Sequence, residues 1–314
     1  MLNVVIIGFG NIGYRHYQGL IRSKHKLSIY INDIDDNAFS KINDSELSNN
    51  TYFIPIIDNL PNDIFLLISA TSSYQRYNHL NQITSKKHVN YIILEKMTFQ
   101  QAYDYEKYIN ITSKQKIQSY VNCARRQWDS YNKLKHYLNN EKIINFKVTG
   151  GDWNLASNTI HYLDLAIFLL SSKPDQLELK PNFKDLYLPS KRSNYFEIYG
   201  EINGSINQTK LNINSSNNVE SVKIVIKTSS GKQILIEESK NQITFENQNG
   251  KKVENFATFF QSQITHFYLK DLLEIKNSKL PIVDENFIIQ VKLLKLYKDH
   301  QDKFIPNEKR CLIT

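Results

Sequence analysis

The sequence predicts an α/β protein in two parts: a doubly wound parallel sheet over residues 1–123, and an α/β domain with a large open, mostly antiparallel sheet over 124–314. In the first part, short apolar runs that do not alternate in polarity indicate strands buried on both faces. In the second part, several expected strands alternate in polarity and are joined by turn signals such as SSGK and NQNG. The late helices of the second part could pack back on the first.

The first part is expected to hold five strands, at 3–7, 27–32, 64–69, 91–94 and 116–121. A helix is expected directly after the first strand, over 11–24, because Ile12, Leu20 and Ile21 form a weak apolar face. This order of strand, helix and strand is typical of a parallel sheet that is covered by helices.

The second part is expected to hold strands at 144–150, 195–202, 221–231, 232–238 and 242–247. Helices are expected over 129–140, 257–276 and 285–300. The last two helices are separated by Leu280-Pro281, since proline cannot continue a helix.

The composition is that of a globular protein, because 314 residues with 41% hydrophobic content can bury a large core without disulfides or structural metal ions. The two cysteines, Cys123 and Cys311, lie far apart, so we expect neither a disulfide framework nor a metal site, and a reducing cytosol fits best. The first ten residues do not read as a signal peptide, and no apolar stretch approaches the roughly 20 residues of a membrane span. We expect a cytoplasmic protein with no membrane partner.

The formal net charge is +8, yet the lysines are scattered and no nucleic-acid-binding motif is present. We therefore expect no nucleic-acid partner. A lysine-rich surface accounts for the charge, and attraction of an anionic small molecule such as a sugar phosphate is the functional alternative.

The stretch GFGNIG (8–13) has the pattern G-x-G-x-x-G, directly after an expected strand and at the start of an expected helix. That context is the one in which the pattern indicates a dinucleotide-binding, Rossmann-type domain. Gly8 permits the tight turn, Gly10 lets the backbone approach a pyrophosphate, and Gly13 lets helix and strand pack closely.

The pyrophosphate is expected on the free N–H groups of the helix N-terminus, which adds Asn11 and Ile12 to the cofactor-binding residues. Asp33 stands twenty positions after Gly13, where an acid holds the adenosine ribose. Its carboxylate would repel a 2′-phosphate, so NAD(H) is expected in preference to NADP(H). Two alternatives stay open: Asp33 is a simple turn residue, or Asp35 is the ribose ligand.

Thr71 and Ser72, in SATSS after the third predicted strand, could line the nicotinamide side of the cofactor, or they could form an ordinary strand–helix turn with an N-cap. Glu95 and Lys96 end the strand YIIL on the same side as the glycine loop. A half-desolvated lysine at this place could have a lowered pKa and exchange a proton with a substrate hydroxyl. The alternative is a surface lysine.

In GGDWNLASNTIHYLDLAIFLL (150–170), His161 and Asp164 are three residues apart on an expected helix and therefore share a face. Ser157 or Asn158 is the expected N-cap of that helix. The acid could orient the imidazole for proton transfer, or both residues could belong to a solvated polar face.

The motifs GFGNIGYRH, ATSS, LEK and NTIHYLD, in this order and spacing, resemble the Gfo/Idh/MocA family, the group of glucose–fructose oxidoreductase and inositol 2-dehydrogenase. The resemblance covers most of the chain. It implies an NAD(P)-dependent oxidoreductase acting on a sugar, sugar phosphate or nucleotide-sugar. It also implies a homodimer or homotetramer that assembles through the C-terminal sheet.

The family's E-K-P motif falls on Glu95-Lys96-Met97, and its H-x-x-D motif falls on His161 and Asp164. The resemblance thus makes Lys96 and His161 the proton-transfer candidates, with Asp164 as the third catalytic residue and Glu95 at the cofactor. Met97 stands where the motif has proline, so the loop lacks the restriction on φ that a proline imposes.

Two further departures are Arg76, where a histidine is common, and Thr159, where a glycine is frequent. We expect both to alter substrate contacts. Substrate contacts are also expected from Arg125, which could grip a phosphate or carboxylate, from Trp128, which could stack on a sugar or base, and from Asn158. For Arg125 and Trp128 the alternative is packing at the domain interface.

Family members that resemble this chain in the patterns Ser-Asn-x-x-His and Gln-Ser-Gln-x-Thr are often associated with nucleotide-sugar or surface-polysaccharide pathways, so the resemblance implies such a pathway. Two other functions stay open. One is a catalytically silent sensor or scaffold that keeps the cofactor site, and the other is a reductase of a non-sugar substrate such as a tetrapyrrole.

Overall fold

The computed structural model describes residues 1–190, 192–216 and 218–313. The chain divides into two compact units, Met1–Ala124 with Phe259–Asp284, and Arg125–Thr258 with Glu285–Thr314. The division differs from two continuous segments in one respect: a late stretch that contains a helix joins the first unit.

The first unit is built on a six-stranded sheet of order β3-β2-β1-β4-β5-β6, in which every neighbouring pair is parallel. The prediction of a doubly wound parallel sheet is confirmed, since the apolar runs are buried strands. The short strand β3 was not predicted because it has only three residues, one of them exposed. The strand bounds are Leu2–Ile7 (β1), Leu27–Asn32 (β2), Thr51–Phe53 (β3), Asp63–Ser69 (β4), His88–Leu94 (β5) and Gln118–Val121 (β6).

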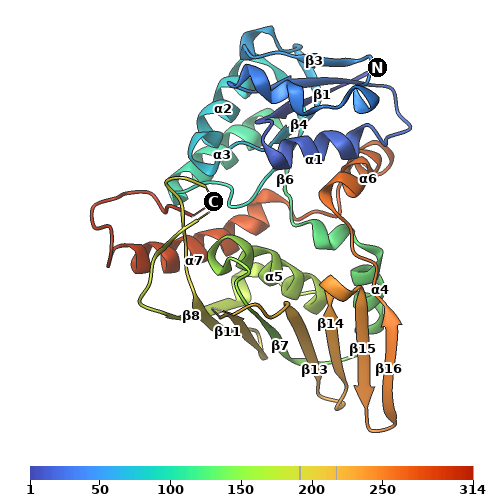
Figure 1. Ribbon diagram of the computed structural model, residues 1–314, viewed down its shortest axis with the longest axis vertical. Coiled ribbons are helices and arrows are strands. Elements are labelled where there is room, and N and C mark those ends of the chain that lie inside the picture. Colours follow the sequence, from blue (N-terminus) through green and yellow to red (C-terminus); the bar gives the residue numbers. More distant parts are fainter. Residues whose placement is uncertain (191, 217, 314) are drawn as a thin grey trace. The chain divides into compact units, whose positions relative to one another are not determined.

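Two pairs of helices flank this sheet, α1 with α6 and α2 with α3 (Figure 1). Helix α6 belongs to this unit because its apolar residues Ile264 and Leu269 join Tyr17 of α1 and Val4 of β1 in one core cluster. A Cβ on Gly19 of α1 would lie 2.7 Å from the Thr265 side chain of α6, so a glycine lets these helices touch. The helix bounds are Asn11–Leu20 (α1), Ser73–Lys86 (α2), Ala102–Gln115 (α3) and Gln261–Glu274 (α6).

The second unit carries an eight-stranded sheet of order β16-β15-β14-β13-β7-β12-β11-β8 in the described part of the chain. The β7–β12 pair is parallel and the other pairs are antiparallel, as the expected open, mostly antiparallel sheet requires. The strand bounds are Ile143–Gly150 (β7), Leu177–Phe183 (β8), Gly200–Ile206 (β11), Thr209–Ser215 (β12), Lys223–Thr228 (β13), Gln233–Glu237 (β14), Gln242–Asn247 (β15) and Gly250–Asn255 (β16).

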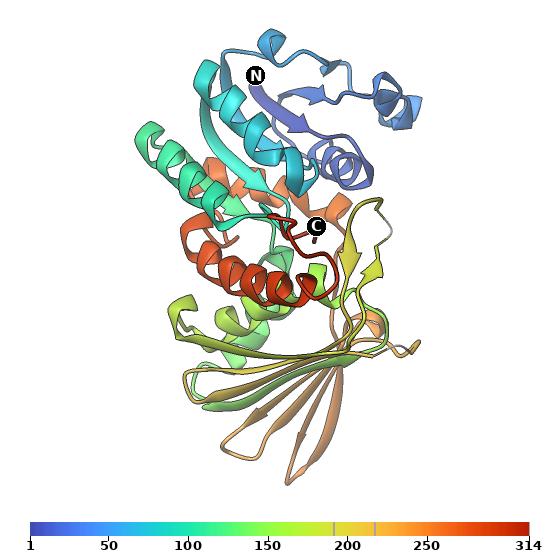
Figure 2. The ribbon, with the colours of Figure 1, turned by 90° about the vertical axis from the view of Figure 1, so that its left-hand side faces the viewer.

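Helices α5 (Leu155–Leu170) and α7 (Val283–Gln301) lie over one face of this sheet, and α4 (Asp129–Tyr137) packs against α5 (Figure 2). In β7, Phe146 and Val148 are fully buried whereas Lys147 between them is exposed, so the two faces differ in polarity. Within the described residues, no helix has both the length and the apolar character that crossing a bilayer requires.

The single strand predicted over 195–202 is wrong. The chain forms β10 (Phe196–Glu197), which pairs with β9 (Leu188–Pro189), and enters β11 only at Gly200. Gly200 has φ +129, a conformation that favours glycine and breaks the extended run.

The predicted N-cap of α5 is also wrong. The helix begins at Leu155, after Asn154, whose φ is 58. The carboxylate of Glu197 accepts the N–H of Ala156 at 3.0 Å, the N–H of Ser157 at 3.4 Å and the Ser157 hydroxyl. A carboxylate distant in sequence therefore caps this helix, which local spacing could not predict.

Candidate active site

Three loops of the first unit follow adjacent parallel strands. The glycine loop follows β1, the stretch with Thr71 and Ser72 follows β4, and the stretch with Lys96 follows β5. Because the carboxyl ends of parallel strands meet at one edge of the sheet, these loops share that edge. The sequence-predicted residues Gly10, Thr71 and Lys96 thus lie at the same edge of one sheet.

The structure gives a different reason for the glycine at each of the three positions of the loop. Gly8 has φ +82, and a Cβ on Gly13 would lie only 2.0 Å from the carbonyl oxygen of Gly8, so the fold itself requires both. Gly10 has φ −67, and a Cβ there would have no heavy atom within 4 Å. Neither the backbone nor the packing of this chain requires a glycine at position 10, whereas close approach of a bound pyrophosphate does.

The N-terminus of α1 suits an anion. No side chain caps this helix, and its first turn, which the structure describes completely, contains no acid. The N–H groups of Asn11 and Ile12 belong to that first turn, where helices leave donors without intrahelical partners. The residues present therefore fit the pyrophosphate of a dinucleotide.

Asp33 follows β2 and contacts the glycine loop. One carboxylate oxygen accepts the N–H of Phe9 at 2.5 Å, and the other accepts the N–H of Asp35 at 3.0 Å. Asp35 instead caps a 3-10 helix by accepting the N–H of Asn37 at 3.0 Å. Lys41 also reaches this loop, because its Nζ donates to the carbonyl oxygen of Phe9 at 3.0 Å.

Ser72 occupies the N-cap position of α2, but its side chain does not make the capping bond. Two hydroxyls near this turn, Ser69 Oγ and Thr71 Oγ1, are buried and have no hydrogen-bond partner among the described residues. Since buried polar groups are nearly always paired, this end of β4 stands out as a place that a bound group could complete.

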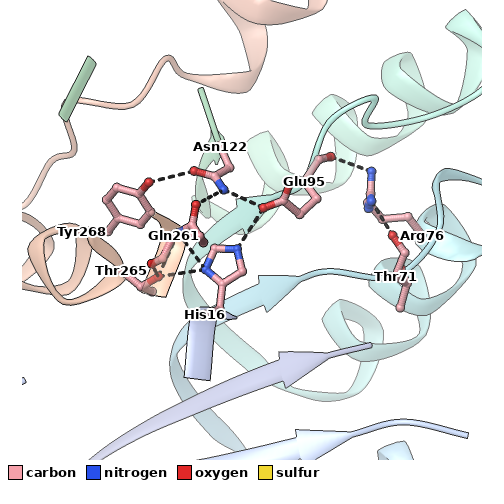
Figure 3. Close-up of polar contacts among 8 residues, drawn as sticks. All are labelled: His16, Thr71, Arg76, Glu95, Asn122, Gln261, Thr265 and Tyr268. Carbon is pink, nitrogen blue, oxygen red and sulfur yellow. Dashed lines mark hydrogen bonds and ion pairs between the residues drawn. The ribbon is translucent and has the colours of Figure 1, made fainter. Parts of the chain in front are cut away.

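The carboxylate of Glu95 lies in a buried network (Figure 3). It accepts from His16 Nε2 at 2.9 Å and from Asn122 Nδ2 at 2.6 Å. Burial alone would raise the pKa of Glu95, but the bonds from His16 and Asn122 and the charge of Lys96 lower the pKa below its ordinary value. The structure thus gives Glu95 the role of anchoring the loop, and the expected contact with the cofactor stays a prediction.

The same network extends to α6. The Tyr268 hydroxyl donates to Asn122 Oδ1 at 2.8 Å, and Thr265 Oγ1 lies 3.1 Å from His16 Nδ1. His16 and Asn122 were missed as site residues. Residue type gave no signal for them, since a histidine on a helix and an asparagine after a strand are both common.

Arg76 and Thr159 are both buried and bonded to backbone, and an effect of these two departures on substrate contacts stays a prediction. Thr159 Oγ1 donates to the carbonyl oxygen of Leu155 at 2.7 Å within α5. Arg76 is 1% exposed, and its guanidinium donates to backbone carbonyls on both sides of Lys96, which is itself half-buried.

In the second unit, most of α5 is buried, and His161 and Asn158 are among its half-exposed residues. Asn158 donates to the carbonyl oxygen of Trp153 at 2.8 Å. Asp164 is buried and pairs with Arg126, whose Nε and Nη2 lie 2.9 and 2.7 Å from its two oxygens. Burial raises the pKa of the Asp164 carboxyl, and the Arg126 guanidinium opposes that rise. A role of Asp164 in orienting His161 stays a prediction.

Arg125 is held in a two-pronged ion pair by Glu238, with both N–O distances 2.6 Å, and its guanidinium lies 4.6 Å from the centre of the Tyr162 ring. Burial would raise the pKa of Glu238, but the charge of Arg125 holds the pKa below its usual range. Trp128 is 8% exposed and stacks on Tyr131. Substrate contacts by Arg125 and Trp128 stay predictions, and binding of an anion by Arg125 would have to compete with Glu238.

No protein-family model matches the sequence, and no curated protein does. Solved structures share the whole architecture. UDP-N-acetylglucosamine 3-dehydrogenase GnnA from Acidithiobacillus ferrooxidans superposes with a TM-score of 0.74 at 10% identity, over 94% of this chain and 96% of that one. An oxidoreductase from Agrobacterium radiobacter, solved with NAD+, L-tartaric acid and magnesium, gives 0.73 at 13% identity, over 96% and 97%.

A third similar structure is the super-repressor mutant of Gal80p from Saccharomyces cerevisiae, with a TM-score of 0.76 at 11% identity over 96% of both chains. At these identities the likeness establishes the fold. The chain has the fold of the Gfo/Idh/MocA-type dehydrogenases, and that fold also occurs in a protein named as a repressor.

Proposed function

We propose that this protein is an NAD(P)-dependent oxidoreductase that moves a hydride between the nicotinamide and a hydroxyl or carbonyl carbon of a sugar, sugar phosphate or nucleotide-sugar. The observation that carries the proposal is Gly10. A Cβ at this position would meet no protein atom, which leaves a backbone surface open above a helix N-terminus. Lys96 follows a strand at the same edge of the same sheet.

When bound, the nicotinamide supplies or accepts the hydride. Lys96 would take the proton from the substrate hydroxyl in oxidation and return it in reduction. Lys96 is half-buried and directly follows β5, at the edge of the sheet where the glycine loop also lies, so its position supports this role. His161, half-exposed on α5, is the second proton-transfer candidate, with Asp164 in support.

NAD(H) is the proposed cofactor. Asp33 supports this preference, because its carboxylate stands at the glycine loop, where a 2′-phosphate would meet a negative charge. Lys41 contacts the same loop and is the group that would favour NADP(H) instead. A thermal-shift titration with NADH against NADPH decides between them, and tighter binding of NADPH would overturn the assignment of Asp33.

The proposed substrate is sugar-like and anionic. The titles of two similar structures name a UDP-N-acetylglucosamine dehydrogenase and a myo-inositol dehydrogenase, and the net charge of +8 suits an anion. The same proposal includes a place in nucleotide-sugar or surface-polysaccharide synthesis. It also includes a homodimer or homotetramer that assembles through the large C-terminal sheet.

The direct experiment uses UDP-, GDP- and CMP-sugars and sugar phosphates, each mixed with the protein and NAD+ or NADH. Substrate-dependent change of the nicotinamide absorbance in single turnover is the expected result. If NADH binds and no member of the panel gives turnover, the substrate class is wrong.

A second candidate is a cofactor-binding protein without turnover. Met97, in place of the motif proline beside Lys96, and the likeness to Gal80p favour it. This candidate predicts NADH binding together with unchanged biological function after Lys96→Ala.

A further inference from the structure

A buried arginine lies next to the proposed catalytic lysine. Arg76, in the first turns of α2, is 1% exposed and is one of the largest fully buried side chains. Burying a guanidinium costs several kcal/mol unless its N–H groups are well bonded. The groups that bond to the buried guanidinium of Arg76 should therefore show why it is tolerated there.

The explanation lies in the backbone of two loops. Arg76 Nη1 donates to the carbonyl oxygens of Glu95, Met97 and Thr98 at 2.6, 2.7 and 2.7 Å. Arg76 Nη2 donates to the carbonyl oxygen of Thr71 (Figure 3). One side chain therefore joins the loop after β4 to the loop after β5, using carbonyls that have left the sheet and need donors.

These carbonyls flank Lys96 closely. Glu95 directly precedes it, and Met97 and Thr98 directly follow it. From the other side, the Glu95 carboxylate is held by His16 and Asn122. The backbone that carries Lys96 is thus held from two sides, by Arg76 and by the bonds to the Glu95 carboxylate. Of these, Arg76 also bonds to the loop at Thr71, which is proposed to line the cofactor.

We infer that Arg76 is a positioning residue for the reaction: it fixes the backbone on both sides of Lys96 and so sets where the lysine amine stands relative to the loop at Thr71. The inference rests on the proposed function for its catalytic readout. A planar guanidinium can serve several carbonyls at once because its donors form a rigid fork, whereas a lysine offers three donors from one point.

The test compares Arg76→Gln and Arg76→Lys with Arg22→Gln, which removes an exposed arginine from the same unit. Each folded variant is assayed well below its melting temperature for kcat, for NADH affinity, and for amide hydrogen exchange of residues 96–99. We expect Arg76→Gln to lower kcat by about 100-fold, because misplacing a reacting group by an ångström costs that much. NADH affinity should change far less, and exchange at 96–99 should become about tenfold faster.

Arg76→Lys should recover part of both effects, and Arg22→Gln should match the wild type. A folded Arg76→Gln protein with wild-type kcat and wild-type exchange would overturn the inference. If the wild type binds NADH but shows no turnover on the sugar panel, the proposed substrate class is wrong, and amide exchange of residues 96–99 still tests whether Arg76 fixes the backbone around Lys96. If Arg76→Gln does not fold, Arg76→Lys decides: faster exchange at 96–99 supports the inference, and unchanged exchange contradicts it.

Discussion

Replacing Gly10 by serine is expected to remove cofactor binding and leave the fold intact. The position has φ −67 and open space for a Cβ, so serine fits without strain. Gly10 is the N-cap of α1, and serine is a favoured N-cap residue. Its hydroxyl would also compete with the pyrophosphate for the N–H groups of the first turn.

The size of the expected change in Tm follows from the stabilisation of the folded state by bound cofactor. NADH at 100 times its dissociation constant stabilises the protein by about 2.7 kcal/mol. For a unit of this size that corresponds to a rise of roughly 5–10 °C in Tm. Gly10→Ser should lose nearly all of that rise, while stability without cofactor should change by no more than about 0.5 kcal/mol.

The assay is thermal unfolding with and without NADH, and Gly13→Ala is the matched control. A Cβ on Gly13 would lie 2.0 Å from the carbonyl oxygen of Gly8, so this variant should lose about 1–3 kcal/mol or more even without cofactor. The reasoning is refuted if Gly10→Ser keeps the wild-type response to NADH, or if it destabilises the protein as much as Gly13→Ala does.

Two further predictions concern acids of the same unit. Asp33→Asn should raise the affinity for NADPH relative to NADH by about tenfold, or about 1.4 kcal/mol, because a charge that repels the 2′-phosphate is removed. Titration with both nucleotides checks this, and an unchanged ratio of the two dissociation constants would contradict it. Glu95→Gln should cost about 1–3 kcal/mol of stability at neutral pH. The folded pKa of Glu95 is lowered from 4.5, so the unfolded chain binds its proton first as pH falls. The contribution of Glu95 is therefore full above about pH 5 and is lost as pH falls through the folded pKa. Urea unfolding at neutral and acidic pH should show the wild-type advantage shrink, and a constant difference would count against the buried network.

The Rossmann sheet could be predicted from the sequence because each strand carries its own signal. Val4–Ile7 and Ile64–Ile68 are apolar without alternation, and burial on both faces demands that pattern. The glycine motif indicated the position of the first turn, because Gly13 packs against the carbonyl oxygen of Gly8 and Gly8 has the positive φ that favours glycine.

Other features could not be predicted, because their causes lie far away in sequence. The apolar pattern of α6 left open whether the helix packs on the first or the second part, and the structure places it in the first unit, against Tyr17 and Val4. Glu197 caps α5 across some forty residues, and no spacing rule links them. A buried Arg76 looks the same in sequence as a surface arginine, because its partners are carbonyls, which every residue has.

The most direct measurement of the central claim is single-turnover reduction of NAD+ by the best sugar substrate, with wild type, Lys96→Met, His161→Ala and the exposed-lysine control Lys24→Met. The account predicts that Lys96→Met binds NADH as the wild type does but loses about 100-fold or more of the rate. Lys24→Met should keep the wild-type rate. Near-wild-type turnover in both Lys96→Met and His161→Ala would contradict the account.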